Sequence, residues 1–224
     1  MNYVLWPLFT SLALGLASLR AESIDLAKVP LKPVQVSVSH AVILGRNAVR
    51  VTKDPGITKV DEATFAWVGG TNFKDGIIEI DVLARLLADA PDWARGFIGI
   101  AFRINDASSR FESFYVRPTN GRADDQLRRN RSTQYFSYPD YKFDRLRKES
   151  PGQYEAYADM GLNEWITIKI VVQGAQAKMY LNGKDQPVLV VNDLKHGPDS
   201  TGAIGLWVDV GTEGYFSNLR VQPR

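Results

Sequence analysis

The feature that most limits how this chain can fold is a two-residue alternation of apolar and polar side chains. It is clearest over residues 78–82, 98–103, 166–172 and 204–209, where glycine, asparagine, aspartate or proline lies nearby. Successive side chains of a strand point to opposite faces, so such segments are typical of half-buried antiparallel strands. No long amphipathic helix separates them. The sequence therefore predicts an all-β jelly-roll sandwich of two antiparallel sheets with about a dozen strands.

The N-terminal segment differs from the rest of the chain. Residues 4–17 form an uncharged apolar run, and small residues stand at Ala17 and Ala21. The run is shorter than the roughly 20 apolar residues of a membrane-spanning helix, and its length fits a secretory signal. We predict a signal peptide over residues 1–21 and one jelly-roll domain over residues 22–224. A buried first strand or helix is the alternative, because no Lys or Arg precedes the run.

The composition excludes several kinds of chemistry. The 224 residues include no cysteine, which removes disulfides, thiolate metal sites and a cysteine nucleophile. Export of such a chain suits the bacterial periplasm or the extracellular space, with membrane contact only during export. The net charge of +2 is too small for the whole chain to bind polyanions. Asp- and Asn-rich turns could hold Ca²⁺, but none has diagnostic spacing, so we expect no metal site and no cofactor.

A long segment over residues 118–160 interrupts the alternation, whereas connections between strands usually take about 4–6 residues. Its many tyrosines argue against disorder, and residues 124–131 and 141–148 are candidates for short helices. Residues 110–148 carry ten Lys and Arg against five Asp and Glu, although the whole chain is nearly neutral. We therefore predict an ordered, partly helical insertion, rich in arginine and tyrosine, at which a ligand binds.

Three segments resemble strands of known modules. Residues 73–81 (FKDGIIEID) resemble the early strand of laminin-G-like and other concanavalin A-like modules, residues 164–183 their central strand pair, and residues 202–221 their final strands. The resemblance implies the concanavalin A-like lectin/glucanase fold over most of residues 65–223. Within that fold the chain is most similar to secreted bacterial domains related to the 3-keto-disaccharide hydrolases. The fold hosts lectins, adhesins and glycosidases, so the resemblance implies a carbohydrate ligand without fixing an activity.

The candidates for proton transfer are Glu79, Asp81, Asp209 and His196. Glu79 and Asp81 match the opening of the Glu-x-Asp-x-x-Glu pattern of laminarinase-like glycosidases, and alternate strand positions place them on one face. Retaining hydrolysis needs a second carboxyl about 5–5.5 Å away, and here the pattern lacks its last glutamate. The alternative is that both acids form ion pairs with Arg85 or Arg103.

The polar faces of the strands predict where a sugar binds. If the aliphatic side chains face the core, the opposite faces carry Gly99, Ala101, Gly205 and Trp207 beside charged residues. We expect an open concave sheet on which an aromatic ring stacks against a pyranose, with core packing of Trp207 as the alternative. The residues expected to contact the ligand are Arg103, Tyr115, Arg117, Asn120, Arg122, Arg128, Arg129, Tyr135, Tyr138, Tyr141, Arg145 and Trp207.

These features predict a carbohydrate-binding or carbohydrate-processing domain that acts on an oligosaccharide or other glycoside at the concave face. An enzyme of this type would hydrolyse a 3-keto-glycoside, or act on it as a lyase or hydratase. Its arginines would hold the negative charge of an enediolate or a carboxylate. A binding module would use the same surface without turnover. The alternative is a non-catalytic cell-envelope protein that docks a protein partner through the 118–160 insertion; because the chain is expected to be exported, no nucleic-acid partner is expected.

Overall fold

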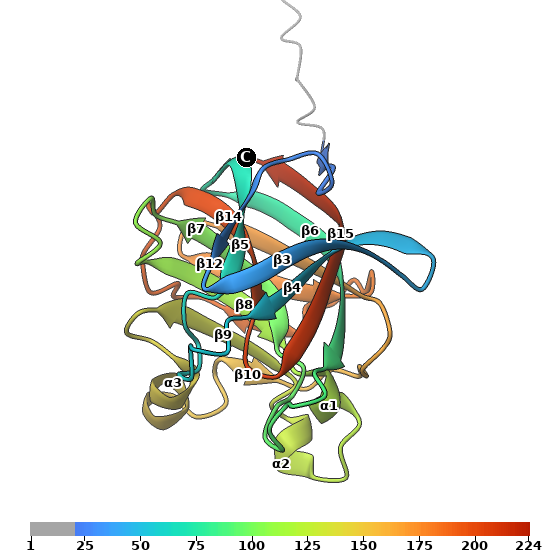
Figure 1. Cartoon of the computed structure of the whole chain (residues 1–224). Coiled ribbons are helices and arrows are strands. Elements are labelled where there is room, and N and C mark those ends of the chain that lie inside the picture. The colour runs from blue at the N-terminus through green and yellow to red at the C-terminus, as the bar shows by residue number, and fades with distance from the viewer. Residues whose placement is uncertain (1–20) are drawn as a thin grey trace, which may run out of the picture.

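Two antiparallel β-sheets pack face to face in the computed structural model, which describes residues 21–224 (Figure 1). The predicted signal peptide therefore lies outside the described residues, apart from Ala21. The eight-stranded sheet contains, in spatial order, β13 (Leu189–Val191), β12 (Gln176–Leu181), β11 (Ile166–Gln173), β6 (Gly76–Leu86), β15 (Thr212–Pro223), β4 (Arg46–Lys53) and β3 (Val36–Ile43), with β1 (Glu22–Ile24) paired to β15. The seven-stranded sheet contains β10 (Glu155–Ala156), β9 (Thr133–Tyr138), β8 (Phe111–Val116), β7 (Ile98–Ile104), β14 (Gly202–Val208), β5 (Phe65–Phe73) and β2 (Leu31–Val34).

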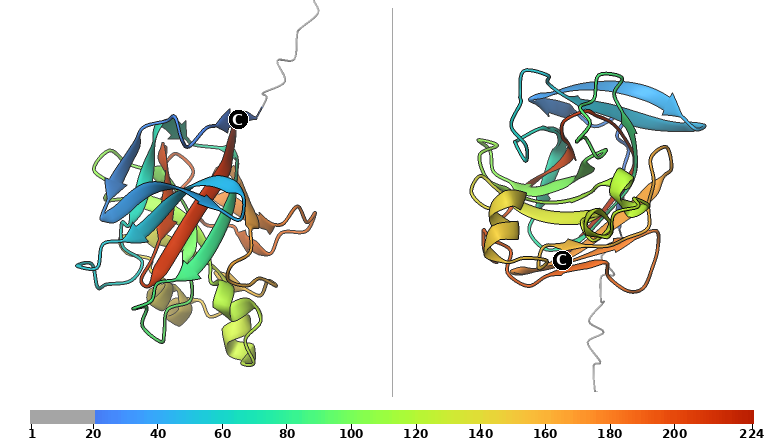
Figure 2. Two further views of the ribbon diagram at one scale, coloured as in Figure 1. Left: turned by 45° about the vertical axis from the view of Figure 1, so that its right-hand side comes forward. Right: turned by 90° about the horizontal axis from the view of Figure 1, so that it is seen from below.

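The core between the two sheets follows the predicted alternation. Ile80 and Ile168 come from the eight-stranded sheet and Ile100 and Leu206 from the seven-stranded sheet, and each is at most 1% exposed. Burial of one such side chain contributes about 1.5–3 kcal/mol relative to leaving it in water. The prediction of an all-β sandwich of two antiparallel sheets is confirmed, and Figure 2 shows its two layers from further sides.

The other face of the seven-stranded sheet is not the open surface that the sequence predicts. Trp207, Tyr115 and Phe136 lie on this face and are buried, with the ring centroids of Tyr115 and Trp207 4.8 Å apart. The connection over residues 54–64, between β4 and β5, covers Trp207, whose indole N–H donates to the carbonyl oxygen of Glu62 (2.9 Å). The expectation was wrong because alternation shows which positions share a face, but not which connection covers it.

Glu79 and Asp81 do not belong to that surface. Both lie on the outer face of the eight-stranded sheet, because Ile80 between them points into the core. Glu79 forms an ion pair with Arg220, and Asp81 forms one with Arg46 (3.1 Å). The expectation that these acids share a surface with Trp207 was therefore wrong. Their ion-pair partners also differ from the expected Arg85 or Arg103.

Arg103 braces the turns at one end of the sandwich. Its buried guanidinium donates hydrogen bonds to the carbonyl oxygens of Lys74, Gly174 and Gly197 and to Asp75 Oδ1 (3.1 Å). The backbone of Arg103 has a φ of +54°, where the pairing of β7 with β14 shifts its register. Such a bulge redirects a side chain, so Arg103 leaves the face on which strict alternation would place it.

The 118–160 insertion belongs to the sandwich more fully than the sequence predicts. It supplies β9 and β10 to the seven-stranded sheet, together with three short helices, α1 (Pro118–Gly121), α2 (Gln126–Arg129) and α3 (Phe143–Glu149). Helix α2 lies within the predicted stretch 124–131, and α3 overlaps the predicted stretch 141–148 but extends one residue beyond it. Strand β9 has no apolar–polar alternation because nearly all its side chains are buried. All three helices lie at the same end of the sandwich, with α3 apart from α1 and α2 (Figure 1). No helix in residues 21–224 is long and apolar enough to cross a membrane.

Candidate functional site

A pocket of about 250 Å³, the Asp61 pocket, opens at the end of the sandwich that carries the helices. Its walls come from the 54–64 connection, residues 91–97, the end of β8 and the insertion. The lining residues are Val60, Asp61, Trp93, Arg95, Phe97, Tyr115, Arg117, Asn120, Arg128, Arg131, Phe143, Arg147 and Asp209. Pockets for drug-sized ligands measure about 300–1,000 Å³, so this one suits a single small ring better than an extended chain.

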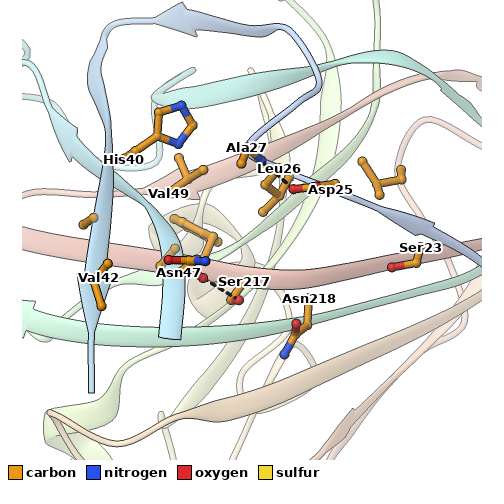
Figure 3. A pocket seen from close by; sticks show the side chains of 14 residues that line it. Ser23, Asp25, Leu26, Ala27, His40, Val42, Asn47, Val49, Ser217 and Asn218 are labelled. Atoms are coloured by element: carbon orange, nitrogen blue, oxygen red, sulfur yellow. Dashed lines mark hydrogen bonds between the residues drawn. The ribbon is translucent and has the colours of Figure 1, made fainter. Parts of the chain in front are cut away.

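A larger hollow of about 740 Å³ lies between β1, the β3–β4 hairpin and β15 (Figure 3). Its polar lining includes neutral side chains such as Asn47 and Asn218. Its carboxylate, Asp25, forms an exposed ion pair with Lys28 (2.9 Å), and His40 is exposed. Because this hollow gathers no buried ionisable groups, we place the candidate site in the Asp61 pocket.

Two nearly fully buried aspartates, Asp61 and Asp209, form the acidic part of the pocket. Asp209 Oδ1 accepts hydrogen bonds from the Lys53 ammonium (2.5 Å) and the Val210 N–H (2.7 Å), and its Oδ2 accepts the N–H of Asp61 (2.8 Å). Both oxygens of Asp209 are thus engaged, and this residue anchors the 54–64 connection. The Asp61 carboxyl instead accepts the Phe143 N–H at Oδ2 (2.8 Å).

The Asp61 carboxyl titrates near neutral pH. Burial raises its pKa from 3.8 to about 7, and the negative charge of Asp209 adds to the increase. The Phe143 N–H, the Arg117 charge and a hydrogen bond with the Tyr115 hydroxyl act in the opposite direction. Within residues 21–224, no salt bridge neutralises this carboxyl. A carboxyl of this kind, facing a pocket, is suited to take up and release a proton at neutral pH.

The shifted pKa predicts a pH-dependent stability. Between about pH 4 and pH 7 the native state keeps the Asp61 proton, whereas the unfolded chain releases it. The native state is therefore favoured at low pH, and this contribution, on the order of 4 kcal/mol in total, is lost progressively as the pH rises from about 4 to about 7. Urea unfolding should show that the free energy of unfolding decreases from pH 5 to pH 8 by more in the wild type than in Asp61→Asn. Equal decreases in the two proteins would contradict the prediction.

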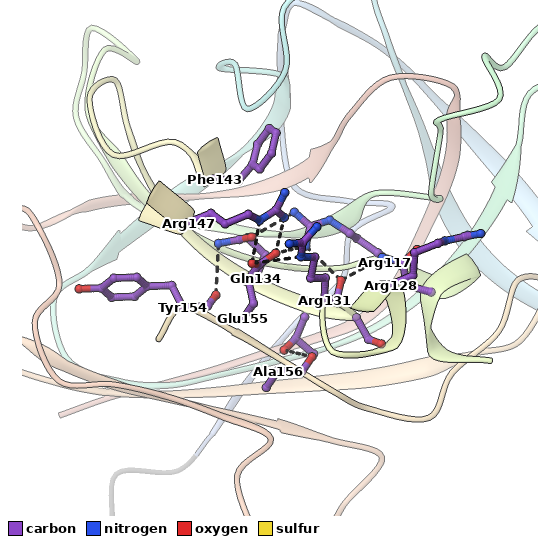
Figure 4. Close-up of polar contacts among 12 residues, drawn as sticks. Arg117, Arg128, Arg131, Gln134, Phe143, Arg147, Tyr154, Glu155 and Ala156 are labelled. Atoms are coloured by element: carbon purple, nitrogen blue, oxygen red, sulfur yellow. Dashed lines mark hydrogen bonds and ion pairs between the residues drawn. The ribbon is translucent and has the colours of Figure 1, made fainter. Parts of the chain in front are cut away.

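Three arginines share one buried carboxylate beside Asp61 (Figure 4). Glu155 accepts hydrogen bonds from Arg147 (2.9 Å at Nε) and Arg117 (3.1 Å), and lies 3.8 Å from Arg131. Both terminal nitrogens of Arg117 are engaged, because they also donate to the Tyr115 hydroxyl (2.7 Å), to a side-chain amide and to a backbone carbonyl. Its role is therefore to position Tyr115, whereas Arg131 and Arg147 keep donors available to a ligand.

Arg95 and Arg128 lack a carboxylate partner. Arg95 donates only to the carbonyl oxygens of Asp92 and Ala94, and Arg128 makes two weak contacts of 3.4 Å with Asn120 and a backbone oxygen. Neither side chain forms a salt bridge with any residue in the described range. Burial lowers the pKa of Arg95, and the charges of Arg128 and Arg117 lower it further. The two guanidinium groups thus lie in a half-buried place without a matching anion.

Aromatic side chains complete the wall of the pocket. Tyr115 and Phe143 lie on the Arg117 guanidinium at 4.9 and 5.9 Å, and Phe97 at 6.0 Å. Trp93 is 47% exposed, in the segment before β7. An exposed indole beside polar groups can stack on the apolar face of a sugar ring while its neighbours bind the hydroxyl groups.

Some of the residues selected from the sequence meet in this pocket. Those that line it are Tyr115, Arg117, Asn120, Arg128 and Asp209. Those that lie outside it are Glu79, Asp81, Arg103, Arg122, Arg129, Tyr135, Tyr138, Tyr141, Arg145, His196 and Trp207. Among the latter, Arg122 pairs with Asp159 (2.8 Å) and Arg145 pairs with Glu149 (2.8 Å) on the surface.

His196 holds a connection in place rather than facing the pocket. Its Nδ1 lies 3.1 Å from Arg110 Nη2, and its Nε2 lies 2.8 Å from the carbonyl oxygen of Tyr138. Since guanidinium is only a donor, Nδ1 is the acceptor and Nε2 carries the proton. Its backbone N–H donates to the buried Glu112 (2.8 Å).

Sequence reasoning missed several members of the site. They are Lys53, Val60, Asp61, Trp93, Arg95, Phe97, Arg131, Phe143, Arg147 and Glu155. The charge excess of the insertion pointed to Arg131 and Arg147 as part of a group, but not to their common partner. Asp61 lies in a connection without a motif, and its positive φ of +49° is invisible in a single sequence.

Comparison with known proteins agrees with this fold. Residues 41–222 match the model of the 3-keto-alpha-glucoside-1,2-lyase-like domain. The chain belongs to this family. The resemblance to domains related to the 3-keto-disaccharide hydrolases is therefore confirmed. The matched region contains both aspartates and all five arginines of the Asp61 pocket. No curated protein matches the chain.

Two solved structures share the concanavalin A-like architecture with this family member. The carbohydrate-binding module CBM66 from Bacillus subtilis is 15% identical, with a TM-score of 0.53, and the match covers 84% of this chain and 95% of the module. A candidate glycosyl hydrolase from Parabacteroides distasonis is 14% identical, with a TM-score of 0.51, covering 87% of this chain and 100% of the other. At these identities the similarity shows the fold alone.

Proposed function

We propose that this domain binds one ring of a glycoside in the Asp61 pocket and cleaves 3-keto-glycosides by elimination, with Asp61 as the base. The observation that carries the proposal is a buried carboxyl, free of ion pairs in the described residues, that opens into an arginine-lined pocket. The family match and the carbohydrate-related proteins with this fold support a sugar as the ligand.

The proposed step begins beside the ketone. Asp61 removes the proton from C2, the electrons form the C1–C2 double bond, and the C1–O bond breaks. The leaving alkoxide takes a proton from the solvent, and Asp61 later returns its proton to the solvent, so the products are an unsaturated keto sugar and the free alcohol. The free donors of Arg131 and Arg147 stabilise the negative charge that develops on the ketone oxygen. A base with a pKa of about 7 is half ionised at neutral pH, which suits this task.

Other residues have supporting roles in this proposal. Asp209 and Lys53 fix the 54–64 connection, so that Asp61 keeps its direction. Arg117 positions Tyr115, and Trp93 supplies a stacking surface at the rim. The apolar run at residues 4–17 supports export of the chain to the periplasm or the extracellular space.

The test compares p-nitrophenyl 3-keto-glucoside with p-nitrophenyl glucoside as substrates of the purified protein. We expect release of nitrophenol from the keto substrate only, because only that substrate has an acidic C2 proton. In deuterated water, proton NMR should show an unsaturated product that has lost the C2 proton. Binding of either sugar without release would indicate a binding module, and neither binding nor release would contradict the proposal.

A further inference from the structure

The charges of the Asp61 pocket do not balance. Five arginine side chains line the pocket, and Lys53 lies directly behind it, whereas the carboxyl groups in and behind its wall are Asp61, Asp209 and Glu155. Lys53 and Asp209 neutralise each other. Glu155 is the shared ion-pair partner of Arg117, Arg131 and Arg147. The pocket therefore has a strong excess of positive charge, even when Asp61 is ionised.

The unmatched charges are concentrated on Arg95 and Arg128. In Figure 4, Arg117, Arg131 and Arg147 converge on Glu155, while Arg128 lies to one side of them. Arg95 contacts only backbone oxygens, and the contacts of Arg128 are 3.4 Å long. Two like charges in a half-buried place repel each other, and guanidinium groups bind planar or tetrahedral oxyanions through paired hydrogen bonds.

From this arrangement we infer that the pocket selects a sugar ring with an anionic substituent, a carboxylate or a sulfate ester, held by Arg95 and Arg128. This inference rests on the proposed function, since it names the class of glycoside that the same pocket takes. The negative charge that develops in the elimination step does not explain why Arg95 and Arg128 lack an anionic partner. Arg131 and Arg147 lie nearer to Glu155 and keep donors for that charge.

The experiment measures dissociation constants by calorimetry for methyl glucoside, methyl glucuronide and methyl glucoside 6-sulfate. The three ligands share one ring and differ only at C6, so they report the effect of the anion alone. We expect at least one anionic ligand to bind about tenfold or more tightly than methyl glucoside at low salt, because hydrogen bonds between ions are strong. The preference should shrink at about 0.5 M salt, where charges are screened. The tighter of the two anions identifies the substituent.

Variants test the assignment to these two residues. Arg95→Gln and Arg128→Gln should each reduce the preference for the anionic ligand to about threefold or less, because each keeps a hydrogen-bonding side chain and removes the charge. Arg145→Gln is the matched control, since Arg145 lies outside the pocket in a surface pair with Glu149, and it should keep the wild-type preference.

Two results would overturn the inference. One is equal binding, or no detectable binding, of all three ligands; the other is an equal loss of preference in Arg145→Gln. These results are separable from failure of the elimination chemistry. Release of nitrophenol without any preference for an anion would leave the proposed function and remove this inference, whereas preferential anion binding without release would do the reverse.

Discussion

Asp61→Asn should lower the rate of nitrophenol release from a 3-keto-glucoside by at least about 100-fold. General acid–base catalysis by a positioned side chain contributes about 100- to 10,000-fold, and an amide cannot accept the C2 proton. The Asn side chain has the same shape, and its oxygen can still accept the Phe143 N–H that the Asp61 carboxyl accepts at 2.8 Å. Initial rates at saturating substrate, followed by absorbance, measure the effect directly.

Glu79→Gln is the matched control for that variant. Glu79 lies on the outer face of the eight-stranded sheet in an ion pair with Arg220, so the same acid-to-amide change should leave the rate within about twofold. The folding of Asp61→Asn is checked by its urea midpoint at pH 8, where loss of the unfavourable Asp61 charge should raise stability. A folded Asp61→Asn protein with the wild-type rate would remove Asp61 from the mechanism.

Glu155→Gln should destabilise the fold by about 3–5 kcal/mol, the cost of breaking a buried ion pair by removing one partner. The Glu155 side chain is 6% exposed and is bound by Arg117 and Arg147, with Arg131 3.8 Å away. Without that charge, the guanidinium groups of Arg117, Arg131 and Arg147 would lose the carboxylate that they share. Urea unfolding at pH 7, extrapolated to zero denaturant, gives the difference in free energy.

The control for this prediction is Glu149→Gln, on α3. Glu149 pairs with Arg145 four residues earlier, at a site where both side chains are at least 42% exposed, and such pairs contribute about 0.3–0.5 kcal/mol. If Glu155→Gln cost no more than Glu149→Gln, Glu155 would not be the centre that holds the arginines. Recovery of stability by added sulfate in Glu155→Gln alone would further support the charge explanation.

The sequence contained enough to predict the sandwich but not its covered face. Alternation assigned Ile80, Ile100 and Leu206 to the core, and burial confirms those positions. The same alternation placed Trp207 on the opposite face, where the 54–64 connection covers it. Coverage depends on tertiary contacts between segments far apart in the chain, and no local pattern records them.

The site was only partly visible in the sequence for a similar reason. The excess of Lys and Arg over residues 110–148 drew attention to Arg117 and Arg128, which do line the pocket. Asp61 is about 150 residues away from Asp209 in the chain, and their hydrogen bond forms only when two connections meet. Its altered pKa results from burial and from that neighbour, and neither can be inferred from residue type.

A crystal structure of Asp61→Asn soaked with a 3-keto-glucoside tests the central claim most directly. We predict that the sugar ring occupies the Asp61 pocket, with C2 within about 3.5 Å of the side chain at position 61 and the ketone oxygen directed at Arg131 and Arg147. A ring bound in the hollow between β1 and β15, or on the outer face of the eight-stranded sheet, with the Asp61 pocket holding only solvent, would contradict the account.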